Sequence, residues 1–496
     1  MKFPTFDIHA IFQQLQYDAK NPLLFNSGFF VYFFVLFLLL FYMLRNRPSA
    51  RTILFCAASL FFFYKASGWF VIMVALSAIV DYVISNLIAV QTNLKAKKLL
   101  LVISIIFNLS ILIYFKYTNF FISIINTKLA GHINPLNILL PVGISFYTFE
   151  NISYTVDVYN GKFSPVKKFS EYLLFLSFFP KLVMGPIVRA ADFIPQINKK
   201  YFVSKEDFHE GFYLILSGLF KKLIISDFIS INFVDYIFDA PQKYTGLECL
   251  MAVYAYAIVI YCDFSGYSSV AIGIARWLGF HIPANFMQPY QSKSLTEFWK
   301  RWHISLSTWL RDYVYIPLGG NRKGKIRTFI HLFITMLLGG LWHGANWTFI
   351  IWGAIHGLGL SIHKLWEEKS AVVLSKINKT ILYTAVSIFV TFHFVCLGWV
   401  FFKADSIQTA FDLLRQIKYH FGADKLDMFV SHYQSVLWMM LVALVLHILP
   451  EKLYEPMLKK LEDIGFIGML LMFFVFLLLY GALKSATPVM PIYLQF

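Results

Sequence analysis

The residues best suited to chemistry lie in one stretch of the chain, from Phe298 to Gly357. This stretch contains Trp, His, Arg and Gly more densely than any other window. Its first cluster contains Trp302 and His303, and its second contains Trp342 and His343. A basic, glycine-rich turn separates the two clusters, while the rest of the chain is mostly apolar. Polar clusters retained in such an apolar chain are usually functional.

His343 is the first candidate for a catalytic group. A neutral imidazole can accept a proton from a hydroxyl or a thiol, which is the role of a general base. Glycines at 339, 340 and 344 would allow another backbone or a slender substrate to approach it closely. The alternative is a structural histidine that bonds between helices. The Trp and Gly context and the second histidine cluster favour the catalytic role.

His303 has a more ambiguous setting. Arg311 and Asp312 follow it closely, and Asp312 could pair with Arg311 or Arg301. The alternative is an interfacial amphipathic helix whose basic residues and tryptophans anchor at lipid headgroups. Composition alone slightly favours that alternative.

Metal and nucleotide sites are poorly supported. His356 and His363 are seven residues apart, which would place them on one helix face, but no further ligand stands at suitable spacing. Residues 319–325 match most of a phosphate-binding loop, yet Ile326 stands where Ser or Thr must reach Mg²⁺, and no parallel-sheet context surrounds it. We therefore expect no metal site and no ATPase.

The basic turn itself could still contact an anionic donor. Asn321, Arg322 and Lys323 are the candidate residues for its phosphates. Most such solvated loops only set membrane topology.

Composition identifies the class of protein. The 496 residues are 58% hydrophobic and 14% charged, against about 45–50% and about 25% in soluble proteins. We therefore predict an all-α polytopic membrane protein. The net charge of +16 indicates positive-inside topology rather than nucleic-acid binding, since no soluble basic domain is evident. The four cysteines form no C-x-x-C pair, which argues against a disulfide framework or a zinc site.

Apolar runs predict about eleven membrane segments, some of them re-entrant. The expected segments are 28–44, 52–64, 70–90, 99–115, 138–159, 172–189, 211–238, 250–275, 380–402, 435–450 and 464–484, with the central stretch between the eighth and ninth. Breaks are expected near 180, 265 and 317, and an external loop at 116–137. We expect one membrane domain over 23–484, after an N-terminal extension (1–22) that could form a surface helix. A tail follows at 485–496. Lys and Arg clusters place both termini outside the cytoplasm.

Several blocks of this chain resemble the membrane-bound O-acyltransferase family. Residues 299–322 and 339–357 are similar to its two signature blocks. The closest similarity is to the bacterial branch that O-acetylates alginate and peptidoglycan. Further matching blocks are 24–27, 141–149, 181–187 and 261–267, so the resemblance covers nearly the whole chain beyond residue 23.

The resemblance implies a fold, a donor and roles for residues. His343 would be the near-invariant catalytic histidine and His303 the second conserved one. The fold would be a ring of tilted helices around a central tunnel, and acetyl-CoA would be the donor. Residues of the two blocks expected to line or support the tunnel are Trp302, Arg311, Asp312, Trp342, Asn346 and Trp347.

The C-terminus, Pro491 to Phe496, is similar to terminal aromatic motifs of this branch. It is also similar to the short partner of the teichoic-acid D-alanylation relative, in which a tyrosine carries the acyl group. Tyr493, activated by His343, could accept the acetyl group as a covalent intermediate. The alternative is an aromatic anchor at the membrane interface.

The expected function is acetyl transfer across the inner membrane of a bacterium, from cytoplasmic acetyl-CoA to an envelope polysaccharide. The resemblance implies a periplasmic acetyltransferase as partner, and membrane lipid surrounds the chain. One alternative is a transporter or polysaccharide exporter, although the inverted repeats that it predicts are not found. Another is an acyltransferase acting on a protein or a lipid, or with another acyl group.

Overall fold

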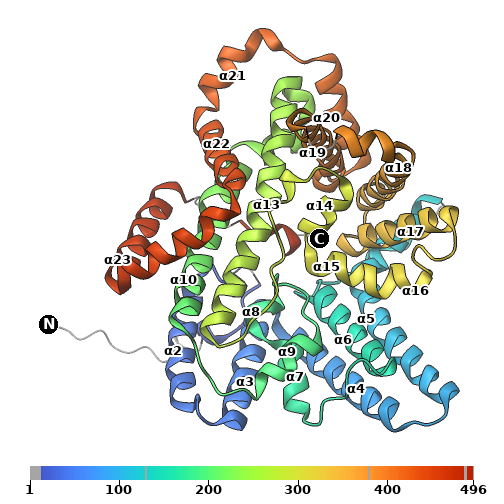
Figure 1. Cartoon of the computed structure of the whole chain (residues 1–496), viewed down its shortest axis with the longest axis vertical. Helices are drawn as coiled ribbons and strands as arrows, with labels where there is room; N and C mark the ends of the chain where they lie inside the picture. The colour runs from blue at the N-terminus through green and yellow to red at the C-terminus, as the bar shows by residue number, and fades with distance from the viewer. Residues whose placement is uncertain (1–12, 20, 129–130, 378–379, 485–488, 495–496) are drawn as a thin grey trace. The chain divides into compact units, whose positions relative to one another are not determined.

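The computed structural model describes residues 13–19, 21–128, 131–377, 380–484 and 489–494. Every regular element in these ranges is helical, which confirms the all-α prediction (Figure 1). Most of the predicted surface helix at 1–22 lies outside the described residues, although 13–15 are helical. The described residues form two compact units, one within 1–203 together with 278–282 and the other within 204–277 and 283–496.

Several helices are long and apolar enough to cross a membrane. Among the described residues six meet this standard, or up to seven if the bent pair at 423–448 counts as one span. They cover Pro48–Val90, Leu94–Thr127, Gly246–Trp277, Lys325–His343, Ile381–Lys403 and Tyr454–Leu483, and Gly28–Leu44 is a shorter apolar helix. The protein is thus a multi-pass membrane protein.

The first unit is built around its N-terminal apolar helices. Its helices are α2 (Gly28–Leu44), α3 (Pro48–Ser67), η1 (Gly68–Phe70), α4 (Val71–Val90), α5 (Leu94–Lys128), α6 (Ile144–Tyr159), α7 (Phe169–Ser177), α8 (Phe179–Leu182) and α9 (Ala190–Ile197).

The first predicted segment, 28–44, coincides with α2. The predicted loop at 116–137 is wrong in its first part, because α5 continues to Lys128. The return segment then bonds to α5, since Asn119 and Asn126 donate to the carbonyls of Leu136 and Ile133.

The predicted break near residue 180 is confirmed. The chain turns between α7 and α8, and the residues after Leu182 leave the helix. A buried ion pair between Glu150 of α6 and Lys181 of α8 stabilises this break. The Glu150 carboxylate also accepts a hydrogen bond from the backbone N–H of Val188 (3.1 Å). Irregular backbone within a membrane domain requires such internal partners.

The second unit carries both histidine clusters. Its longer helices are α10 (Lys205–Leu219), α13 (Gly246–Trp277), α17 (Lys325–His343), α18 (Trp347–Ile377), α19 (Ile381–Lys403), α20 (Ile407–Tyr419), α22 (Gln434–Ile448) and α23 (Tyr454–Leu483). Its shorter ones are η2 (Phe220–Ser226), α11 (Asp227–Ile229), η3 (Ser230–Val234), α12 (Asp235–Asp239), η4 (Pro241–Lys243), η5 (Pro289–Gln291), α14 (Leu295–Arg301), α15 (Ile304–Leu310), η6 (Arg311–Tyr315), α16 (Ile316–Leu318), η7 (Ala423–Lys425), α21 (Leu426–His432), η8 (Glu451–Leu453) and η9 (Ile492–Leu494).

Helices α10 and α13 pack against each other through glycines (Figure 1). A Cβ atom on Gly266 would lie 2.7 Å from the carbonyl oxygen of Gly218, and one on Gly273 would lie 2.6 Å from that of Gly211. The break predicted near residue 265 is therefore wrong, because α13 runs without interruption from Gly246 to Trp277. Gly266 allows a close helix contact there rather than a turn.

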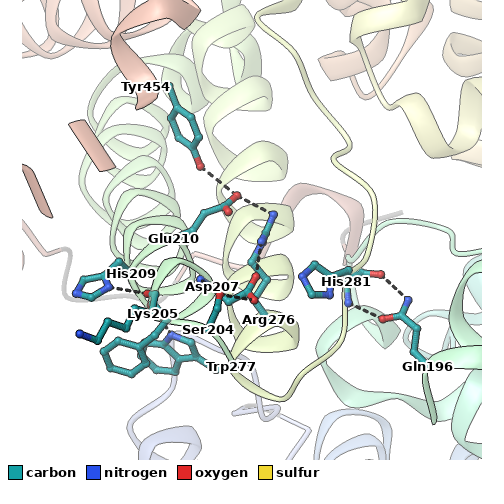
Figure 2. Close-up of polar contacts among 11 residues, drawn as sticks. Gln196, Ser204, Lys205, Asp207, His209, Glu210, Arg276, Trp277, His281 and Tyr454 are labelled. Carbon is teal, nitrogen blue, oxygen red and sulfur yellow. Dashed lines mark hydrogen bonds and ion pairs between the residues drawn. The ribbon is translucent and has the colours of Figure 1, made fainter. Parts of the chain in front are cut away.

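A small polar cluster joins three helices at the end of this pair. As Figure 2 shows, Arg276 of α13 lies between Asp207 and Glu210 of α10, with both N–O distances 2.8 Å. The hydroxyl of Tyr454, at the start of α23, donates to Glu210 (3.3 Å). These partly buried contacts attach α23 to the α10–α13 pair.

The predicted break near residue 317 is confirmed. Helix α15 leads into a π-helical turn, η6, and then into the three-residue α16. Gly319, Gly320 and Gly324 follow with positive φ angles of 123°, 54° and 90°. This conformation favours glycine, so the basic turn depends on its glycines before α17 begins.

Candidate active site

His343 is the last residue of α17 and is 2% exposed. Glycines bring α17 close to α18, since a Cβ atom on Gly353 would lie 2.6 Å from the Met336 carbonyl oxygen. Trp352 of α18 therefore packs against the imidazole, with ring centroids 4.9 Å apart. Phe402 of α19 lies on another side, at 5.1 Å. The predicted base is thus buried among aromatic rings rather than exposed on a lipid-facing surface.

His303 lies between α14 and α15 and is 0% exposed. Its φ angle of 43° is left-handed, which is uncommon for a residue other than glycine. Its Nδ1 atom lies 3.2 Å from Oδ1 of Asn285. Its Nε2 atom has no hydrogen-bond partner among the described residues. Burial lowers the pKa of His303 to about 3, so the ring is neutral at physiological pH. The surface-helix alternative is wrong for this residue.

Tyr493 contacts both histidines. Its ring centroid is 5.5 Å from that of His343 and 6.0 Å from that of His303. Phe264 of α13 packs against it at 4.2 Å. The side chain is 8% exposed, and burial, with a smaller contribution from Asp263, raises the pKa of its phenol well above the usual value. Phe264 and Tyr493 are 229 positions apart in the chain (493 − 264), yet they share one site with the histidines.

The predicted supporting residues divide into two groups. Trp302 and Trp342 are buried beside the site. The ring centroids of Trp342 and His303 are 5.9 Å apart. Arg311 pairs with Asp312 (2.8 Å) on an exposed part of η6, which confirms that these two residues pair. Their exposure places them outside the buried residues around the histidines.

The two other predicted supporting residues lie at the start of α18. Trp347 is 49% exposed. The side chain of Asn346 donates to the Asp405 carbonyl (3.0 Å). Neither residue is buried, so neither belongs to the buried side chains that surround the histidines.

The basic turn lies on the surface of the unit. Asn321, Arg322 and Lys323 are all exposed. His331 of α17 stabilises the turn through a contact of its Nδ1 atom with the Gly320 carbonyl oxygen (2.9 Å). In the part of the chain that the structure describes, no group of three or more His, Cys, Asp or Glu side chains is arranged to hold a metal ion.

Sequence reasoning missed two polar residues of this site. Asn285 contacts His303 from a segment 18 residues earlier. Asp263 accepts a hydrogen bond from the backbone N–H of Ile492 (3.0 Å), next to Tyr493. Asp263 stood in a polar stretch of an apolar segment, which marked it as unusual but did not indicate its partner.

Other buried polar atoms surround the histidines. Nε2 of His303, Nε1 of Trp352 and both ring nitrogens of His356 have no hydrogen-bond partner among the described residues. Trp352 lies between His343 and His356, at centroid distances of 4.9 and 4.8 Å. Buried polar groups ordinarily have a hydrogen-bond partner, so these are the atoms that a bound polar ligand would contact.

Comparison with known proteins identifies the family. Residues 166–401 match the model of the membrane-bound O-acyltransferase family. The chain is 38% identical over 410 residues to a probable alginate O-acetylase of Pseudomonas aeruginosa, covering 82% of this chain and 76% of the relative. It belongs to the membrane-bound O-acyltransferase family.

Two further relatives are also similar to this chain. A peptidoglycan O-acetyltransferase of Helicobacter pylori is 33% identical over 424 residues, covering 79% of each chain. A teichoic acid D-alanyltransferase of Bacillus subtilis is 31% identical over 286 residues, covering 55% of this chain and 71% of the relative. The resemblance inferred from the motifs is thereby confirmed, and the protein is an acyltransferase rather than a transporter.

Proposed function

We propose that this acyltransferase moves acetyl groups from cytoplasmic acetyl-CoA to a polysaccharide of the bacterial envelope, on the outer face of the inner membrane. The contact of Tyr493 with both His343 and His303 carries the proposal. The names of the three relatives, all of which concern acyl groups on envelope polymers, support the choice of substrate class.

The proposed chemistry has two transfers. In the first, the phenol oxygen of Tyr493 attacks the thioester carbonyl while His343 accepts the phenol proton. The carbon–sulfur bond breaks, and the proton passes to the departing CoA thiolate. In the second, a hydroxyl of the acceptor attacks the carbonyl of the tyrosyl ester, and the bond between that carbonyl and the phenol oxygen breaks. The hydroxyl proton passes through His343 to the phenol oxygen, which regenerates Tyr493. The raised pKa of Tyr493 explains why a base is needed, since the free phenol would not ionise.

We assign His303 a positioning role. Because Oδ1 of Asn285 accepts from Nδ1, the proton of the neutral ring lies on Nδ1, and Nε2 is an acceptor without a partner among the described residues. Such an atom suits the orientation of an attacking hydroxyl.

A central tunnel would bring the two substrates together. The buried polar atoms of His303, Trp352 and His356 support such a path, because they would contact the polar parts of a donor. The exposed turn at 321–323 would contact the donor's phosphates. We propose about eleven membrane segments in all, with both termini outside the cytoplasm and a periplasmic acetyltransferase as partner.

The deciding experiment measures ester-linked acetate in the envelope of cells that lack this protein. Cells are complemented with the wild type, His343→Ala or His303→Ala at matched protein levels. We expect only the wild type to restore full acetate. Full restoration by His343→Ala would refute the base assignment.

A second experiment tests Tyr493 as the acyl carrier. The purified protein is given acetyl-CoA without an acceptor, and the C-terminal peptide is analysed by mass spectrometry. We expect an added acetyl group on Tyr493 in the wild type and none in Tyr493→Phe. Failure to find it in a preparation that turns over would refute the carrier role.

A further inference from the structure

A buried ion pair lies directly beside the C-terminal segment. Nζ of Lys222 is 2.5 Å from Oδ1 of Asp263, and these side chains are only 3% and 1% exposed. Lys222 also pairs with Asp227 at 2.7 Å. Two charges of this kind are costly to bury unless the geometry satisfies both.

The glycine contact between α10 and α13 makes this pair possible. Lys222 follows Gly218 by four residues, and Asp263 precedes Gly266 by three, so the pair lies one helical turn from the close contact. Lys222 belongs to the π-helical turn η2, which continues α10. Such turns inside helices frequently occur at functional sites.

The second oxygen of Asp263 is used differently. Oδ2 accepts the hydrogen bond from the backbone N–H of Ile492 at 3.0 Å. Pro491 has no N–H to donate, so Ile492 supplies the backbone donor immediately before Tyr493. One carboxylate therefore contacts the lysine through one oxygen and the C-terminal segment through the other. Hydrogen bonds to a charged acceptor are roughly twice as strong as neutral ones.

From this geometry we infer that Lys222 and Asp263 form a clamp that holds the segment 489–493 in the core and positions Tyr493 against the two histidines. The inference rests on the proposed carrier role for the meaning of that position. Asp263 and Lys222 are positioning residues, since neither is required to touch the acetyl group. Lys222 fixes the Asp263 carboxylate, and the carboxylate fixes the backbone of the segment.

The clamp also explains how a short terminal segment stays ordered beside the reacting atoms. Phe264, the neighbour of Asp263 on α13, packs against Tyr493 with ring centroids 4.2 Å apart. The same turn of α13 therefore contacts the segment through a charged acceptor and through a ring. Holding reacting groups in the attacking geometry is worth large factors in rate, and small displacements can cost about 100-fold.

The test is hydrogen–deuterium exchange of the full-length protein in micelles without substrate, read on the C-terminal peptide. The triple variant Asp263→Leu/Lys222→Met/Asp227→Asn removes the acceptor and all three charges of the cluster, so that no unpaired buried charge remains. We expect the Ile492 amide to exchange at least about ten times faster in this variant. Asp263→Asn, which retains a neutral acceptor, should fall between it and the wild type.

Two controls separate the clamp from general damage. Asp227→Asn removes the other partner of Lys222 but no contact to Ile492, and His343→Ala removes the proposed base. Both should retain the protection of the C-terminal peptide. In the Asp263 variants, kcat for acyl transfer should fall with the loss of protection, while KM for the donor should change little.

The outcomes distinguish the two proposals. Wild-type protection of the C-terminal peptide in both Asp263 variants would overturn the clamp. An active Tyr493→Phe protein would overturn the carrier role but leave the exchange result unaffected, because exchange is measured without turnover.

Discussion

His303 has an unusual backbone conformation that its neighbours maintain. A non-glycine residue in the left-handed region costs about 1–3 kcal/mol and persists only where the surroundings enforce it. Here Asn285 supplies the constraint, because its side-chain oxygen contacts Nδ1 of His303 and accepts from both the N–H and the hydroxyl of Ser305. The carbonyl of Asn285 also accepts from Ile304. One asparagine therefore orients the ring and the turn that carries it.

We predict that Asn285→Ala lowers the acyl-transfer rate by about 100-fold, the cost expected of a small misplacement of a reacting group. The ring of His303 would lose its Nδ1 partner, and its Nε2 atom would no longer point in one direction. Envelope acetate at matched protein levels, or turnover of the purified protein, measures the effect.

A double-variant cycle provides the control. If Asn285 acts through His303, Asn285→Ala should cause little further loss in a His303→Ala background. Additive losses in the two backgrounds would contradict the positioning role.

The packing of helix α17 against α18 determines the position of His343. Gly353 approaches the Met336 carbonyl, and Gly340 approaches the carbonyl of Phe349. Figure 1 shows the two helices side by side. Because α17 ends at His343, a change in the crossing of these helices would move the imidazole relative to Tyr493.

We predict that Gly353→Ala destabilises the protein by about 1–3 kcal/mol, as overpacking of a core does, and also lowers activity. The matched control is Gly339→Ala. A Cβ atom there would meet only the flexible side chain of Leu310, at 3.2 Å, and alanine has the better helix propensity. Thermal unfolding in detergent and turnover measure both effects. Equal stability of the two variants would show that the close crossing is not needed.

The distribution of charge predicts the orientation of the whole chain. The structure shows which basic residues can act as topological signals, and Arg51 is not one of them. Arg51, which follows the first span, is only 4% exposed and donates to the carbonyls of Ile197 and Lys199 at 2.6 and 2.8 Å. It therefore has a structural partner within its unit. Lys95 is exposed and remains a topological signal.

We predict that the turn before α5 faces the cytoplasm and the segment after it faces outward. Thr92→Cys should react with an impermeant maleimide only after spheroplasts are permeabilised, whereas His132→Cys should react in intact ones. Both positions are exposed, and the four native cysteines are buried, so background labelling should be small. The reverse pattern would invert the proposed topology.

The local amino-acid composition of the chain determined its structural class and the positions of most helix breaks. Apolar runs of helical length predicted α2 at its observed bounds, because a span must satisfy its own backbone and shield it with apolar side chains. Proline and glycine predicted the breaks near 180 and 317. The density of His and Trp between 298 and 357 marked both catalytic candidates. The same reasoning failed at Gly266, since glycine can mark either a break or a close helix contact.

Only the tertiary structure decided which distant residues meet. Asn285, Asp263 and Tyr493 come from separate segments, and no local pattern relates them. Their contacts depend on how closely helices approach, which glycine pairs such as Gly218 and Gly266 control. Likewise, the ion pair with Lys222 from another helix offsets the unfavourable free energy of burying the Asp263 carboxylate. Long-range packing and charge pairing are properties of the folded chain, and for that reason the clamp and the histidine support were not evident in the sequence.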